Sequence, residues 1–213
     1  MITQIENALV ERLQKGLGRL VTTVKSYNGE LDDESIGTAR FPLVLVSFGG
    51  SRISRKSISA KRYQSKATFV VLLVVSNLRN ETARRQGGVD SREIGVNQLI
   101  GAVRRLLDSQ TLGNLVNPLL PVRVQTVLNG ARVKANRLTA YAVEYEVSFD
   151  DIAPLEDGLY PQPTTDKSNP DYIFNQYQGL LSPVDELHQV GGIIFDPTSD
   201  AQVPFCVETK EKI

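Results

Sequence analysis

Apolar side chains recur at helical spacing in two stretches of the chain. In residues 2–17 every third or fourth position is apolar, which predicts an amphipathic helix. That stripe consists of Ile2, Ile5, Leu9, Leu13 and Leu17. Residues 89–110 repeat the pattern and predict a second helix, with Asp90 and Ser91 as candidate N-cap residues. Its apolar face comprises Ile94, Val96, Leu99, Val103, Leu106 and Leu107.

Five stretches have the pattern of β-strands. FPLVLVSF (41–48) and ATFVVLLVV (67–75) are continuous apolar runs, which are typical of central strands covered on both faces. LVTTVKSY (20–27) and PVRVQTVL (121–128) are further candidates. RLTAYAVEYEVSF (137–149) alternates strictly, so we expect it to have one buried side and one wet or interface-facing side.

These elements predict one domain followed by a different kind of segment. In residues 1–150 the order is helix, three strands, helix and two strands, which predicts an α+β fold with two helices on a mostly antiparallel sheet. Seven of the ten prolines lie in residues 151–213. Short apolar clusters separated by polar turns predict one or two short strands there, in a segment that packs on the domain or on a neighbouring molecule.

The charges divide at the same place, although the net charge of the chain is zero. Residues 1–150 contain 21 Lys and Arg against 13 Asp and Glu, whereas residues 151–213 contain 3 against 11. The first region is therefore +8 and the second −8. This asymmetry favours contact between the two regions, or between copies arranged head to tail. Two independently solvated surfaces fit the counts equally well.

Basic residues are densest in SRISRKSISAKRYQSK (51–66), which has six basic positions and no acidic one. The stretch joins two apolar strands, so we expect the strands to continue into it as a long exposed hairpin, the basic arm (49–66). Its candidate anchors for a subunit or other protein contact are Arg52, Arg55, Lys56, Lys61 and Arg62. The alternative is a hairpin whose charges are merely solvated, since single surface charges contribute little.

A nucleic-acid-binding module is the main alternative function. Tyr63 lies within the basic arm, and Arg79, Arg84 and Arg85 follow in the next polar loop. Specific binders, however, show a recognition helix or aromatic platforms, and only 7% of this chain is aromatic. The composition therefore favours at most salt-sensitive contact with a phosphate backbone.

The sequence gives little support to an enzyme. Its only histidine, His188, has no cysteine or carboxylate cluster at ligand spacing, and Cys206 lies between apolar residues without a nearby base. Glu144 and Glu146 share a strand face, but a solvated or salt-bridged surface explains them best. No phosphate-binding loop or nucleophile elbow is present. We predict no catalysis, no cofactor and no metal.

No membrane segment or signal peptide is predicted. No apolar run approaches the ~20 residues that a spanning helix needs, and the N-terminus lacks a basic region followed by an apolar one. We therefore expect the chain to be made and kept in the cytosol, away from membranes.

Several features together resemble a known family. They are the MITQIENALVERLQ helix, FPLVLVSF leading through a hairpin into ATFVVLLVV, the helix around GVNQLIGAVRRLL and the closing strand RLTAYAVEYEVSF. Residues 1–150 are in this respect similar to the small virion proteins of Mu-like phages and prophages assigned as tail terminators. The segment after Asp150 is not part of the resemblance.

The resemblance implies an assembly protein of the virion tail or neck, present in the host cytoplasm before assembly. Such a protein forms a hexameric ring that caps the last ring of tail-tube protein, stops polymerisation and presents a surface to the head–tail connector. Genome DNA passes through the channel without specific binding, and no reaction is catalysed. On this reading Arg79, Arg84 and Arg85 are expected on a loop near the channel or the connector.

Overall fold

The computed structural model describes residues 1–29, 39–56, 61–76, 85–88, 94–127, 138–182, 189–196 and 201–208. The chain divides into two compact units, the body (Met1–Ala153) and the extension (Pro154–Ile213), which are described separately. The body contains α1 (Ile2–Leu17), a 3-10 turn (Gly18–Leu20), β1 (Thr23–Ser26), β2 (Leu43–Arg55), β3 (Tyr63–Ser76), α3 (Val96–Leu107), β4 (Leu120–Thr126) and β5 (Leu138–Asp150).

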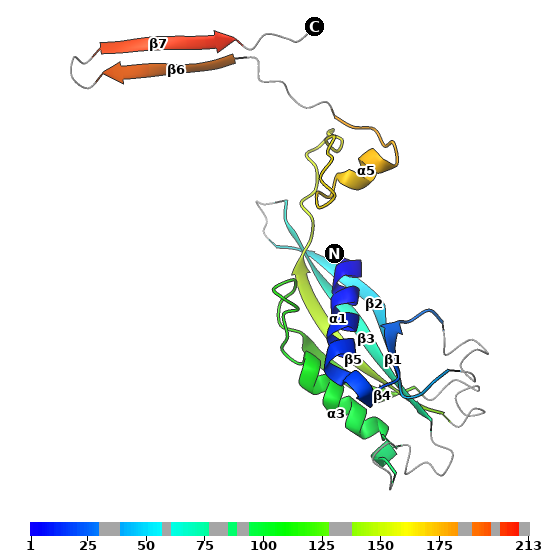
Figure 1. Cartoon of the computed structure of the whole chain (residues 1–213). Coiled ribbons are helices and arrows are strands. Elements are labelled where there is room, and N and C mark those ends of the chain that lie inside the picture. Colours follow the sequence, from blue (N-terminus) through cyan, green and yellow to red (C-terminus); the bar gives the residue numbers. More distant parts are fainter. Residues whose placement is uncertain are drawn as a thin grey trace. The chain divides into compact units, whose positions relative to one another are not determined.

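The body is built on a five-stranded sheet with the strand order β1-β2-β3-β5-β4. β1 pairs with β2 in parallel, and the other three neighbouring pairs are antiparallel. Helices α1 and α3 lie side by side over one face of this sheet (Figure 1). The predicted α+β class, with two helices on a mostly antiparallel sheet, is therefore confirmed.

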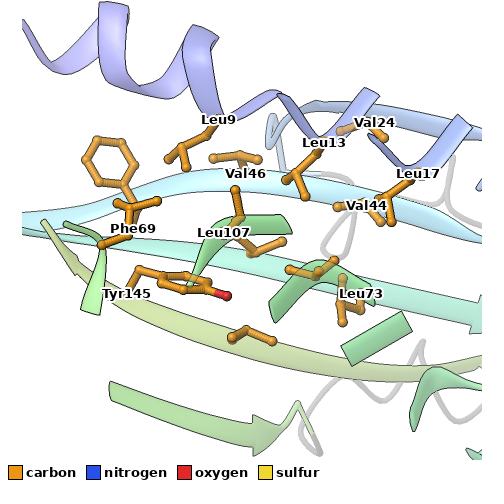
Figure 2. Packing of buried hydrophobic residues seen from close by; sticks show 14 of the residues in the cluster. Leu9, Leu13, Leu17, Val24, Val44, Val46, Phe69, Leu73, Leu107 and Tyr145 are labelled. Atoms are coloured by element: carbon orange, nitrogen blue, oxygen red, sulfur yellow. The ribbon is translucent and has the colours of Figure 1, made fainter. Parts of the chain in front are cut away.

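Helix α1 packs through the apolar stripe that its sequence predicted. Ile5, Leu9 and Leu13 are fully buried, and Leu17 is nearly so. Their spacing of four residues brings them onto one face of the helix, which lies against β2 (Figure 2). Ile2, predicted to belong to the stripe, is instead 38% exposed at the first residue of the helix.

The two helices are also joined to each other. The Arg12 guanidinium Nε donates a hydrogen bond of 2.6 Å to the Leu106 carbonyl oxygen near the end of α3. Gly16 lies so close to Leu106 that an added Cβ would come within 2.6 Å of both methyl carbons of that leucine. A side chain at position 16 would therefore displace the Leu106 side chain, and glycine leaves room for it between the two helices.

The main core lies between these helices and the sheet. It contains alternate residues of the central strands, including Phe69 and Leu73 from β3 and Tyr145 from β5 (Figure 2). Phe48 packs on Phe69, with 5.5 Å between ring centroids and an angle of 59° between ring planes. Burying one such side chain contributes about 1.5–3 kcal/mol, so this cluster supplies much of the stability of the body.

The opposite face of the sheet is divided into an apolar half and a polar half. Leu43, Leu45, Leu72 and Val74 form a second buried cluster together with Leu138, Ala140 and Ala142. Farther along β5, Glu144 and Glu146 lie on this same face and are half-buried. The expectation that one side of β5 is uniformly wet or interface-facing is thus wrong for its first half, where the small alanines are buried.

Helix α3 is shorter than its apolar period predicted. It begins at Val96 with Gly95 as its N-cap, and the Gly95 N–H donates to the Gln98 side-chain oxygen at 3.2 Å. Ile94 precedes the helix, and the proposed caps Asp90 and Ser91 lie outside the described residues. The helical period continues into residues before 96, but the chain leaves the helix at Gly95, so the predicted start at 89 is wrong.

The extension contains a short helix, α5 (Tyr172–Gln176), and two strands, β6 (Gln189–Asp196) and β7 (Ala201–Glu208). Turns before α5 are held by carboxylates: Asp166 accepts a hydrogen bond from the Ser168 amide at 2.8 Å, and Asp171 accepts one from the Gln162 amide at 3.0 Å. β6 and β7 pair antiparallel with each other. The one or two short strands predicted for this segment are therefore present as one hairpin.

Candidate assembly surface

The basic arm forms the hairpin that the sequence predicted. β2 and β3 pair from Leu43 opposite Val74 to Arg55 opposite Tyr63, and the Lys56 N–H donates to the Arg62 carbonyl oxygen at 2.9 Å. β5 accompanies β3 as far as Gln64, which lies opposite Asp150. The described part of the arm is therefore the end of a three-stranded part of the sheet.

A β-bulge between Phe48 and Gly50 sets the direction of the basic side chains. Gly50 has a φ of 114°, a value that side chains rarely allow and that glycine adopts freely. After the bulge, Arg52 lies opposite Lys66 on the face away from the helices, and Arg55 lies on the other face. The arm thus presents cations on both of its faces.

Two cations therefore lie directly opposite each other, Arg52 and Lys66, and this pairing is unfavourable for the hairpin. Glu146 offsets part of this repulsion, since its carboxylate lies 3.6 Å from the Lys66 ammonium group. Gly49, Gly50, Ser51, Thr68 and these three charged residues line a shallow hollow of about 550 Å³. This hollow brings together cations and backbone groups of three strands.

Within the described ranges of the body, Lys56 is the only predicted anchor that forms an ion pair. Its ammonium group lies 2.7 Å from the Asp150 carboxylate, and both side chains are at least half exposed. Arg52, Arg55, Lys61 and Arg62 are exposed, and no ion pair is seen for these four among the residues that the structure describes. Four of the five anchors are accordingly available to another molecule, and their contact role remains a prediction.

The second basic loop is only partly described. Arg85 is exposed, whereas Arg79 and Arg84 lie outside the described residues. The position of this loop near a channel or a connector remains a prediction.

The two glutamates on one face of β5, Glu144 and Glu146, are each engaged by a neighbouring side chain. Glu144 accepts a hydrogen bond of 2.7 Å from the Gln125 side-chain amide, and Glu146 faces Lys66 on the other side. Each glutamate is thus engaged by a different neighbouring strand, and His188 lies outside the described residues. Among the described residues no group of three or more potential metal ligands occurs.

A partly buried polar network holds α3 on the sheet. The Tyr145 hydroxyl donates to Asp108 at 3.0 Å, and the Arg104 guanidinium donates to the other oxygen of that carboxylate at 2.8 Å. Burial and the adjacent Asp108 carboxylate raise the pKa of Tyr145 well above its ordinary value. Tyr145 therefore stays protonated, as a donor that fixes the end of α3, and the network has a structural role.

The comparison with protein families gives a match over residues 1–150, to the family described as Bacteriophage Mu, Gp37. The chain belongs to this family. It is thus a protein of Mu-like phages with a structural or morphogenetic role in the virion. None of the curated proteins compared with the chain matches it. No described helix is long and apolar enough to cross a membrane.

The match covers the sheet and both of its helices in this Gp37-family protein, and it stops at the last residue of β5. The basic arm therefore lies within the family domain, whereas the extension lies outside it.

Two apolar surfaces of this Gp37-family protein were not anticipated from its sequence. Leu120, Val122 and Val124 are 42–60% exposed on β4, which is an edge strand of the sheet. The C-terminal hairpin (β6 and β7) is the second such surface, with apolar side chains 41–63% exposed. A local sequence pattern indicates a strand but not its place in the sheet, so neither exposed surface could be recognised from periodicity.

Proposed function

We propose that this Gp37-family protein is a tail terminator, a ring of six copies that caps the tail tube and stops its polymerisation. The observation that carries the proposal is the family match, which covers the whole of the described sheet domain. The ring also presents a docking surface for the head–tail connector, and genome DNA passes through its channel without specific binding.

A closed ring requires a heterologous contact, in which one surface of a subunit meets a different surface of the next. The division of charge in this chain supplies two such surfaces, since residues 1–150 carry +8 and residues 151–213 carry −8. Complementary charge favours correct encounter more than it adds affinity. The apolar surfaces described above are the parts suited to hold the subunits together.

The basic arm is proposed to contact an acidic surface of a neighbouring subunit or of the tail tube. Arg52 and Lys66 face each other at a cost to the hairpin, and one glutamate offsets this only in part. Carboxylates from a partner would remove the remaining repulsion. The arm thus gains favourable charge interactions on assembly that the free subunit lacks.

The first test is the mass of the full-length protein in solution, alone and with purified tail-tube protein. Six copies of the 23.5 kDa chain give about 141 kDa. By light scattering we expect that mass at high concentration of the free protein, and a heavier complex that contains six copies when tube protein is added. A chain that stays monomeric under both conditions would contradict the ring.

The second test reverses charges on the basic arm. Arg52→Glu combined with Arg55→Glu should prevent tail capping while the circular dichroism spectrum stays unchanged, because both side chains are exposed. Arg19→Glu combined with Arg40→Glu is the matched control, with two exposed arginines elsewhere on the body. Normal capping by the arm variant would mean that the arm is only a solvated hairpin.

The exposed, unpaired arginines of the arm also favour one second candidate, a nucleic-acid-binding module. A titration with duplex DNA at about 50 mM and 200 mM salt separates the two functions. Tight binding by isolated subunits that falls steeply with salt would support the module. Weak binding at both concentrations is expected for a tail terminator.

A further inference from the structure

The C-terminal hairpin carries an apolar surface on each face. Its register places Val190 opposite Val207, Gly192 opposite Phe205 and Ile194 opposite Val203, all on one face. The Phe205 ring covers Gly192 so closely that an added Cβ would lie 2.8 Å from it. On the other face, Ile193 lies opposite Pro204, and Ile193 is 63% exposed. The hairpin thus has two apolar faces and little polar surface between its ends.

A hairpin of this kind is not stable on its own in water, where two strands are marginal without a further strand or a packed helix. Within the described part of the chain, β6 and β7 pair only with each other. Among the residues of the extension whose side-chain exposure the structure describes, only Pro161 is buried. The hairpin therefore needs a surface from outside its own unit.

The body has a sheet edge, β4, that could accept a further strand. β4 pairs with β5 on one side, and no described strand pairs with its other side. Natural edges are usually protected by charges, prolines or bulges. Here Pro121 and a bulge protect only the start of β4, and from Arg123 to Thr126 the register with β5 is regular. This part of the edge has backbone N–H and C=O groups that could pair with another strand. It contains the exposed Val124 and follows the exposed Val122.

We propose that the C-terminal hairpin of one subunit adds to the β4 edge of a neighbouring copy and extends its sheet. β6 lies next to β4 and β7 becomes the new edge, because β7 contains Pro204, which cannot donate to a ladder, whereas β6 contains no proline. The eight residues of β6 suffice to cover the seven of β4.

The occupant is a second copy of this chain because the charges that complement each other belong to the same sequence. The region that holds β4 carries +8 and the region that holds the hairpin carries −8. Strand addition of one copy to the next is also a heterologous contact, as a ring needs. The inference rests on the proposed self-association, but it assigns that contact to a segment outside the family domain.

The test is a disulfide between differently tagged copies of the full chain, all carrying Cys206→Ala to remove the native thiol. One copy carries Val124→Cys, on the helix side of β4, or Arg123→Cys, on its other side. The second copy carries Ile193→Cys or Ile194→Cys, on opposite faces of β6. Neighbouring strands bring paired Cβ atoms within disulfide reach, whereas residues on opposite faces stay apart.

We expect each β4 cysteine to link to only one of the two β6 cysteines, with the preference reversed between positions 123 and 124. Linkage of both β6 positions to both β4 positions would contradict strand addition. A chain that carries both cysteines and forms only an intramolecular disulfide at every concentration would overturn the contact between copies.

Solution mass separates this proposal from the proposed function. An oligomer that forms without any such disulfide would contradict the proposed role of the hairpin but would not contradict the proposed ring. A monomer without disulfides overturns both.

A second variant measures the apolar contribution. Ile194→Lys should raise the protein concentration at half-assembly about tenfold or more, since it removes one large apolar contact. Gln202→Lys adds the same charge to β7 at a polar position and should change this concentration much less. Equal effects of the two would show that charge alone matters and would contradict apolar strand addition.

Discussion

The two hairpins of this protein differ in what stabilises them. The basic arm is an outward continuation of β2 and β3, whose inner halves lie in the core of the body. The C-terminal hairpin has no buried half, and its apolar residues are exposed along its whole length. The arm can therefore carry charges at its end, because the other ends of its strands are packed in the core. The apolar residues of the C-terminal hairpin, by contrast, need to be buried by a surface outside the hairpin.

This difference separates two tasks of an assembling subunit. A charged hairpin on a rigid base guides encounter and discriminates between partners. An apolar hairpin that becomes stable only on binding adds affinity through its buried surface, but part of that affinity is lost to the conformational entropy of ordering the hairpin. The contrast can be tested through the stability of the free subunit, which should depend strongly on the body and little on the C-terminal hairpin.

The largest effect is expected from Leu73→Ala in the core part of β3. Leu73 is fully buried in the main cluster, and truncating such a leucine costs about 2–5 kcal/mol of unfolding free energy. The measurement is urea denaturation of the full-length protein at a concentration where it is monomeric. The matched change in the C-terminal hairpin, Ile193→Ala, should leave that free energy within about 0.5 kcal/mol. A large loss there would show that the hairpin is part of the monomer's folded core.

Two glycines give the next contrast. A Cβ at Gly95 would collide with backbone atoms of Arg85, Gln86 and Gly87, which cannot move without shifting the chain. Gly95→Ala should therefore cost about 1–3 kcal/mol by overpacking. At Gly192 the obstacle is only the exposed Phe205 ring, which can turn away, so Gly192→Ala should have little effect on the same urea midpoint. Equal losses would mean that both glycines are rigidly enclosed.

A smaller effect is expected from the polar network of the body. Tyr145→Phe removes the hydroxyl that donates to Asp108 but leaves the ion pair between Asp108 and Arg104. The loss should be about 0.5–1.5 kcal/mol at neutral pH, as for one hydrogen bond. Leu107, the fully buried last residue of α3, offers a control, because Leu107→Ala should cost more than Tyr145→Phe.

The pH dependence of this loss has a definite sign. The folded pKa of Tyr145 lies above its ordinary value of 10.0, so the unfolded chain releases this proton first as the pH rises. The stability from Tyr145 is therefore fully present below pH 10 and declines above it. The difference in unfolding free energy between the native chain and Tyr145→Phe should shrink above pH 10 in urea titrations. A difference that grows there would contradict the burial of the neutral phenol.

Much of the body could be predicted from local patterns. The buried stripe of α1 and the alternation in the second half of β5 depend only on helix and strand periods, and both appear in the structure apart from Ile2. The continuous runs of β2 and β3 indicated cover on both faces, and Leu45 and Val46 are indeed both fully buried. The predicted start of α3 was wrong because the apolar period extends to residues before Gly95, whereas the helix begins only after Gly95.

Features that depend on strand order could not be predicted. Glu144 and Glu146 were correctly placed on one face, but their partners Gln125 and Lys66 come from strands on opposite sides of β5. The open edge of β4 and the burial of Ala140 likewise follow from which elements are neighbours. No period within a single strand contains that information.

The smallest effect on the unfolding free energy is expected for substitution of Lys56. This substitution tests whether the ion pair of Lys56 stabilises the arm. Its ion pair with Asp150 lies on the surface, where such pairs contribute about 0–1 kcal/mol and are screened by salt. Lys56→Met should lower the unfolding free energy by no more than that, and the loss should vanish at about 1 M NaCl. Arg55→Met, at an exposed cation without an ion pair among the described residues, should have no measurable effect in either salt. A loss of several kcal/mol at Lys56 would mean that the tip of the arm is held by its own body, and its charges would then be structural rather than available to a partner.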